Sequence, residues 1–152
     1  MSLGHLRFEE SAFLTSCAWH PPSLMDAAGT PKTVLIVEND RHLRRSLSFN
    51  LRLIGLQTLE ARGALEAIGL LERHPIDAIV LDLALPGLHG SAVQQEIAAH
   101  PRTRDVPVVV LTASEEPPKD VSPGCVLKRP VTPWMIVDAL MRYLRTCRGE
   151  RA

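Results

Sequence analysis

Apolar and polar positions follow two periods along residues 33–144. Short apolar runs, several of them rich in β-branched residues, predict buried strands at 33–37, 78–81, 106–111 and 125–127, with a further candidate strand at 57–60. Apolar residues at helical spacing predict helices between Asp40 and Gly55, over 64–73, over 91–99 and from Thr132 to Leu144. Strands that alternate with helices favour an α/β fold, with a parallel sheet covered on both faces.

Residues with a preference for helix ends support these limits. Asp40 is placed to cap the first helix and Gly55 to end it. Thr132 is placed to cap the last helix, and Pro133 occupies its first position. In the second helix, Leu65, Ile68 and Leu71 are expected to line one face, with Ala64 and Ala67 beside them.

One helix of the alternation is missing from the pattern. Residues 114–124 contain three prolines and one large apolar residue, which predicts a loop or one broken turn between the last two strands. Residues 1–30 show no sustained period, and we interpret them as a loose N-terminal extension. We therefore expect one domain over 31–147, followed by a short tail at 148–152.

Composition narrows the class of protein. The 152 residues are 45% hydrophobic and 22% charged, as in an ordinary globular domain, and the formal net charge is zero. A neutral chain without a basic block gives no electrostatic footprint for nucleic acid or an anionic membrane. No apolar run is long enough for a membrane span. The three cysteines are far apart and odd in number, which favours a reduced, cytoplasmic protein without a zinc site.

Candidate chemistry gathers where the predicted strands end. Glu38 follows the first strand and Asp82 the third, Thr112 ends the fourth, and Lys128 and Arg129 end the fifth. In a doubly wound sheet, ligands bind at the carboxyl ends of the strands. Clustered carboxylates suit magnesium, and an aspartate can act as a nucleophile toward phosphorus. A hydroxyl and a cation can stabilise the charge on a phosphoryl group during its transfer. Taken alone, each of these residues is more simply interpreted as structural: a helix cap, a turn residue or a surface charge. For Asp82 the structural and the functional interpretation are more evenly balanced.

The motifs in order resemble those of response regulator receiver domains. The first strand leads into an acidic position at Glu38-Asn39, and the third into Asp82-Leu83-Ala84-Leu85-Pro86-Gly87-Leu88-His89-Gly90, which matches the family's acceptor loop. Thr112-Ala113 and Arg129-Pro130 match the later motifs, and the proline is usually cis in the family. The resemblance covers roughly residues 32–146.

The resemblance implies a flavodoxin-like, five-stranded parallel sheet of order 2-1-3-4-5 and a phosphoryl group accepted by Asp82. The donor would be a histidine kinase or a histidine phosphotransfer protein. Magnesium would be the cofactor, held by Glu38, Asn39, Asp82 and the backbone carbonyl of Ala84. Thr112 would contact the phosphoryl group. The domain would assist its own phosphorylation and dephosphorylation only, so it would not be an enzyme toward other substrates.

The resemblance also indicates how the domain would pass its signal on. The stretch after the last helix is too short for a DNA-binding or enzymatic domain. We therefore expect output through contacts with a protein target that the sequence does not identify, without direct DNA binding. The sequence also allows a homodimer.

Four departures from the family pattern concern magnesium binding and the way in which phosphorylation would change the activity of the domain. Asn39 replaces the usual aspartate, which should weaken magnesium binding. Arg129 replaces the usual lysine. It keeps the positive charge, but its planar guanidinium is bulkier than an ammonium group, so the two residues are not interchangeable. Lys128 is a weaker candidate for that role, because alternation along the strand should point it to the other face. Val126 replaces the usual aromatic residue, and the fourth helix is shortened or missing.

Three other functions are compatible with parts of the pattern. A degenerate receiver would keep the fold as a phosphorylation-independent protein-binding module, which Asn39, Arg129 and Val126 favour. A haloacid dehalogenase phosphatase would use an Asp-x-Asp motif, but Ala84 stands at its second position. A flavodoxin relative would need a glycine-containing phosphate loop after the first strand, and residues 38–41 contain no glycine.

Overall fold

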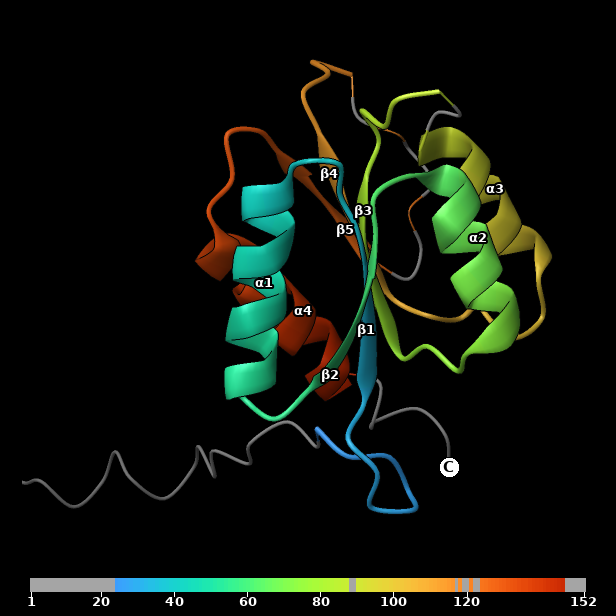
Figure 1. Ribbon diagram of the computed structural model, residues 1–152, viewed down its shortest axis with the longest axis vertical. Coiled ribbons are helices and arrows are strands. Elements are labelled where there is room, and N and C mark those ends of the chain that lie inside the picture. The colour runs from blue at the N-terminus through green and yellow to red at the C-terminus, as the bar shows by residue number, and fades with distance from the viewer. Residues whose placement is uncertain (1–23, 88–89, 117, 119–120, 122–123, 147–152) are drawn as a thin grey trace, which may run out of the picture.

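The computed structural model describes residues 24–87, 90–116, 118, 121 and 124–146. Five parallel strands form one sheet of order β2-β1-β3-β4-β5, which confirms the flavodoxin-like order. The strands are β1 (Thr33–Val37), β2 (Gln57–Ala61), β3 (Ala78–Asp82), β4 (Val108–Thr112) and β5 (Gly124–Lys128). All five carboxyl ends therefore lie at one edge of the sheet, the upper edge in Figure 1.

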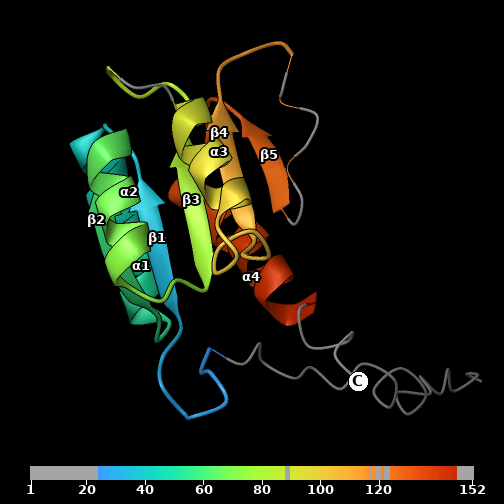
Figure 2. The ribbon, with the colours of Figure 1, turned by 90° about the vertical axis from the view of Figure 1, so that its right-hand side faces the viewer.

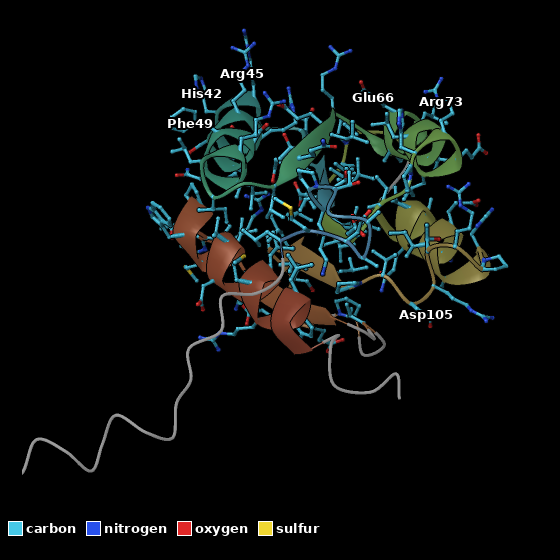
Figure 3. The ribbon with its side chains drawn as sticks, turned by 90° about the horizontal axis from the view of Figure 1, so that it is seen from below. His42, Arg45, Phe49, Glu66, Arg73 and Asp105 are labelled. Atoms are coloured by element: carbon cyan, nitrogen blue, oxygen red, sulfur yellow. The ribbon has the colours of Figure 1, made fainter. Side chains whose placement is uncertain are left out.

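Two helices cover each face of the sheet (Figures 1 and 2). The helices are α1 (Arg41–Leu53), α2 (Ala64–Arg73), α3 (Gly90–Ala99) and α4 (Pro133–Thr146). Seen from below the strands, α1 and α4 lie on one side of the sheet and α2 and α3 on the other (Figure 3). Each face encloses its own cluster of buried apolar side chains, so the three central strands β1, β3 and β4 are buried on both faces.

The residues at the helix ends act as the sequence predicted. The Asp40 carboxylate accepts hydrogen bonds from the backbone N–H groups of His42 and Leu43, at 2.8 and 2.9 Å. The Thr132 hydroxyl accepts one from the N–H of Met135 at 3.4 Å. Gly55 follows α1 with a φ of 98°, a conformation that glycine adopts without a steric cost. The cap at Asp40 starts α1 at Arg41, so only Asn39 and Asp40 separate the helix from Glu38.

The outer surface of the helices carries some apolar residues. Phe49, together with His42 and Arg45, points away from the sheet on α1 (Figure 3), and its exposed fraction is 63%. The expectation for Leu65 was wrong, because this side chain is 75% exposed. Ala64, Ala67 and Leu71 form the buried stripe of α2 instead. Small residues therefore set how closely α2 approaches the sheet.

The limits of four strands also differ from the sequence interpretation. β2 and β3 each end one residue later than predicted, at Ala61 and Asp82. β4 begins at Val108 rather than at position 106, because Val106 precedes Pro107 in a bend. The strand continues to Thr112, one residue further than predicted. β5 spans Gly124–Lys128, one residue longer at each end than predicted. The extensions bring Thr112 and Lys128 into the sheet register as a pair.

The segment between β4 and β5 contains no helix among its described residues, 113–116, 118 and 121. The remaining residues of the predicted loop, 117, 119, 120, 122 and 123, lie outside the described part of the chain. The helix pair on one face of the sheet, α2 and α3, therefore has no helical neighbour beside β5 among the residues described. β5 is also the edge strand of the sheet, and it is only half-buried along Gly124–Leu127, whereas β3 and β4 are buried throughout.

Of the predicted N-terminal extension, residues 1–23 lie outside the described residues. Residues 24–31 form a turn in which the Asp26 carboxylate accepts hydrogen bonds from the N–H groups of Ala28 and Thr30, both at 2.8 Å. Leu24 packs against the core on the α1 and α4 face. In the described residues no helix is both long and apolar enough to cross a membrane.

Candidate functional site

The sheet register brings two carboxylates together. β1 and β3 are neighbours, with Val37 paired to Leu81, so Glu38 and Asp82 leave the sheet at the same level. Both side chains are buried, with exposed fractions of 1% and 3%. The strand order that places them side by side was the condition for a common site.

Arg129 joins these two carboxylates. Its Nη2 atom lies 2.6 Å from Oε2 of Glu38 and 3.0 Å from Oδ2 of Asp82. The backbone N–H of Arg129 donates to the carbonyl of Thr112 at 2.8 Å, which holds the residue at the edge of β4. A single guanidinium nitrogen thus bridges two buried acidic groups, and such charge-assisted hydrogen bonds are stronger than neutral ones.

The charges at this edge influence one another. Burial raises the pKa of Glu38 and the nearby Asp82 charge adds to this effect, while a hydrogen bond from the Asp40 backbone and the charge of Arg129 partly oppose it. Burial alone would lower the pKa of Arg129, but the charges of Glu38 and Asp82 outweigh it and raise this pKa above its usual value. Arg129 is therefore a permanent cation whose presence favours the charged form of Glu38.

Backbone groups hold the remaining oxygens in position. Oδ1 of Asp82 accepts a hydrogen bond from the N–H of Ala84 at 3.0 Å, and Oε1 of Glu38 accepts one from the N–H of Asp40 at 3.0 Å. The buried Thr112 hydroxyl accepts a hydrogen bond from the N–H of Ser114 at 3.0 Å. Its own hydrogen can point toward a group bound at the carboxyl edge.

Two of the predicted site residues, Asn39 and Lys128, are exposed and do not contact the Arg129 cluster. Asn39 is exposed in the turn after Glu38. Lys128 is exposed and its Nζ atom pairs with Glu115 at 2.5 Å, so the ammonium group does not join the Arg129 cluster. The expected alternation along β5 explains this difference between neighbouring cations.

Arg44 is a residue of the site that the sequence analysis missed. This buried side chain donates through Nη1 to the backbone carbonyls of Glu38 at 2.8 Å and Asn39 at 3.3 Å, and its Nε atom lies 3.3 Å from Oε2 of Glu60. Arg44 thereby holds the turn formed by Glu38 and Asn39 in position. Its position with Leu47, Ser48 and Leu51 on the buried stripe of α1 was the available signal.

A magnesium site was predicted here. In the described part of the chain, no group of three or more acidic, histidine or cysteine residues is arranged to hold a metal ion. The oxygen donors are of the type that magnesium prefers, but Glu38 and Asp82 both contact the Arg129 guanidinium. A dication between them would meet that positive charge, so the residues in this arrangement do not fit magnesium and Arg129 together.

Comparison with known proteins identifies the family. The model of the response regulator receiver domain matches residues 34–122, more than half of the chain. The chain therefore belongs to the response regulator receiver domain family, the class of signalling domain found in two-component systems. The matched region ends before β5 and thus before Arg129.

Individual relatives agree with this assignment. The chain is 36% identical over 83 residues to ycf27, a probable transcriptional regulator from Cyanidium caldarium, covering 55% of this chain and 32% of the relative. It is 30% identical over 119 residues to the phosphate regulon transcriptional regulatory protein PhoB from Pseudomonas aeruginosa, covering 75% of this chain and 52% of the relative. The chain thus spans about a third to a half of the length of these curated relatives.

A solved structure shows the same fold. The receiver domain of a sensor histidine kinase from Pseudomonas aeruginosa, described with a magnesium ion coordinated in its active site cleft, aligns with a TM-score of 0.65. The two are 25% identical, and the alignment covers 74% of this chain and 97% of the other.

Proposed function

We propose that this chain is a phosphoacceptor domain of a phosphorelay, in which Asp82 takes a phosphoryl group from a histidine kinase or a histidine phosphotransfer protein. The observation that carries the proposal is the buried Asp82 carboxylate at the carboxyl end of β3, next to Arg129 and paired in register with Leu111, the residue before Thr112. In a sheet of this type, that edge is where ligands bind.

The proposed step is a transfer between two nucleophiles. An oxygen of Asp82 forms a bond to phosphorus while the bond from phosphorus to the donor histidine nitrogen breaks. That nitrogen keeps the bonding electron pair, and the other ring nitrogen carries the proton. The product is an acyl phosphate on Asp82 and a neutral histidine on the donor.

Residues of this chain have separate tasks in the step. The Ala84 N–H holds the acceptor carboxylate through Oδ1. The Arg129 guanidinium, already beside Oδ2, can turn toward the phosphoryl oxygens and stabilise their charge. The Thr112 hydroxyl can donate to one of the same oxygens. Because the Asp82 side chain is only 5% exposed, Arg129 has to move before a phosphoryl group reaches it.

Magnesium, which the resemblance implies as cofactor, would supply charge neutralisation at the phosphoryl oxygens when bound. Glu38, Asn39, Asp82 and the carbonyl of Ala84 would hold it once Arg129 had released the carboxylates. The proposal further places the chain in the cytoplasm as a signalling domain that acts through contacts with another protein. In it, the chain catalyses no reaction beyond its own phosphorylation and dephosphorylation.

The test is intact-mass analysis after incubation with acetyl phosphate, with and without magnesium. Wild type should gain one phosphoryl adduct, and Asp82→Asn should gain none, because the amide is not a nucleophile toward phosphorus. Asp40→Asn is the matched control, since Asp40 lies at the same edge but is exposed, and asparagine also caps helices. This control should be labelled like wild type.

Two results would contradict the proposal. An adduct that persists in Asp82→Asn would place the acceptor elsewhere. No adduct on folded wild type, either from acetyl phosphate or from a phosphorylated histidine phosphotransfer protein, would favour the degenerate protein-binding module.

A further inference from the structure

The bridge formed by Arg129 has a consequence for cation binding at the carboxyl edge. Two buried carboxylates share one guanidinium nitrogen, at 2.6 and 3.0 Å. Buried charges are strongly destabilising unless they are paired and hydrogen-bonded. Here Arg129 supplies both the charge and the hydrogen bonds, so the site is partly neutralised by a residue of its own chain.

The residues around the bridge strengthen this effect. Asn39, next to Glu38, is neutral and exposed, so it adds no negative charge that would attract a second cation. Arg44 donates to the backbone carbonyls of Glu38 and Asn39 and pairs its own charge with Glu60, so it holds the turn without attracting a cation to it. Arg129 is therefore the cation that contacts Glu38 and Asp82, and an added dication would have to compete with it for both carboxylates.

The chemistry of arginine makes the bridge persistent. A guanidinium is planar, carries five N–H donors and stays protonated, so it can hold two carboxylates at once and does not lose its charge to make room. A lysine ammonium in the same place would be a more strongly hydrated point charge. The identity of residue 129, and not only its charge, thus determines how easily the carboxylates are released.

We infer that Arg129 is a built-in counter-ion that competes with divalent cations for Glu38 and Asp82. Magnesium binds to this chain only after displacing the guanidinium, so the resting domain has a lower magnesium affinity than the same site without Arg129. The inference rests on the proposed function in taking Asp82 as the acceptor, and it adds a regulatory property to that site. A donor protein or phosphoryl group that draws Arg129 outward would free the carboxylates.

The experiment is an isothermal titration of the unphosphorylated full chain with magnesium chloride at constant ionic strength. Arg129→Gln should bind magnesium at least about tenfold more tightly than wild type, because a unit positive charge in contact with both carboxylates is removed. Lys128→Gln is the matched control. It removes the same charge from the adjacent residue, whose ammonium group pairs with Glu115 instead, and should stay close to wild type.

A second variant keeps the test decisive if Arg129→Gln does not fold, which circular dichroism would show. Arg129→Lys keeps the positive charge but not the planar fork that holds both carboxylates, so it should also bind magnesium more tightly than wild type, and equal affinity would overturn the inference. Equal magnesium affinity in wild type and folded Arg129→Gln would overturn the inference. So would an equal gain in Arg129→Gln and Lys128→Gln, because general charge would then explain both.

The outcome is independent of phosphoryl transfer, because the titration uses protein that carries no phosphate. If Asp82 accepts no phosphoryl group, the competition between Arg129 and magnesium is still measured. Conversely, a failure of the competition leaves the acceptor test with Asp82→Asn unaffected.

Discussion

Gly90 shows how one residue determines the shape of the acceptor site. A Cβ atom at this position would lie 2.5 Å from the carbonyl oxygen of Asp82 and 2.6 Å from the Cα atom of Leu83. Both neighbours are backbone atoms, which cannot turn aside as the end of a side chain can. α3 therefore begins directly against the strand end that carries the acceptor, and only glycine permits this approach.

At this scale we predict that Gly90→Ala destabilises the domain by about 1–3 kcal/mol, because the added methyl group forces the backbone of Asp82 to shift. Urea denaturation measures the change. Gly69→Ala is the control, since a Cβ there meets only the flexible end of Arg73, and alanine favours helix. Equal stability in the two variants would mean that the approach of α3 to β3 is not sterically limited.

Three polar residues, Asp40, Arg129 and Arg44, differ in how far their roles could be predicted from the sequence. The cap at Asp40 followed from its position alone, because capping depends on a few neighbouring residues. The double contact of Arg129 did not, because it depends on the relative positions of three strand ends. Arg44 was missed because a charged residue within a helix is normally interpreted as exposed.

Among the secondary-structure elements, β5 differs most from its neighbours. Val126 pairs in register with Val110, and both side chains pack on the α2 and α3 face of the sheet. Val110 is fully buried, whereas Val126 is only half-buried. Among the described residues no helix follows β4 to cover this position, so β5 is held mainly by its hydrogen bonds to β4 and by α4 on the opposite face.

The pair makes a direct comparison possible. We predict that Val110→Ala lowers the free energy of unfolding by about 2–3 kcal/mol, from lost burial and the cavity left behind. Val126→Ala should cost roughly half as much or less, since part of the side chain is already in solvent. Both values come from urea denaturation. A cost for Val126→Ala equal to that for Val110→Ala would show that another part of the chain covers this side of β5.

Elements were easier to predict than their exposed faces. The helix Ala64–Arg73 begins and ends where the apolar spacing placed it. The inward face was misjudged at Leu65 because residue size was given more weight than the alanine positions, which allow close packing against a sheet. The prolines and the scarcity of apolar residues between β4 and β5 predicted the missing helix correctly for the residues described.

In the whole molecule, the periodicity alone predicted a parallel α/β domain, and the strand order came from the resemblance to the receiver family. Period and length cannot choose between sheet orders, because any order with helical crossovers would satisfy the same pattern. The observed order places Glu38 beside Asp82. This arrangement gives the molecule one acidic edge, with Arg129 as its internal counter-ion.

Chemical trapping of the acyl phosphate shows directly which residue carries the phosphoryl group. Wild type is phosphorylated, treated with borohydride, which releases phosphate and reduces an aspartyl phosphate to homoserine, and then analysed by tandem mass spectrometry of its peptides. We predict homoserine at position 82 and unchanged aspartate at positions 40 and 77. Homoserine at another position, with aspartate intact at 82, would place the acceptor outside the site formed by Glu38, Asp82 and Arg129 and would rule out Asp82 as the acceptor.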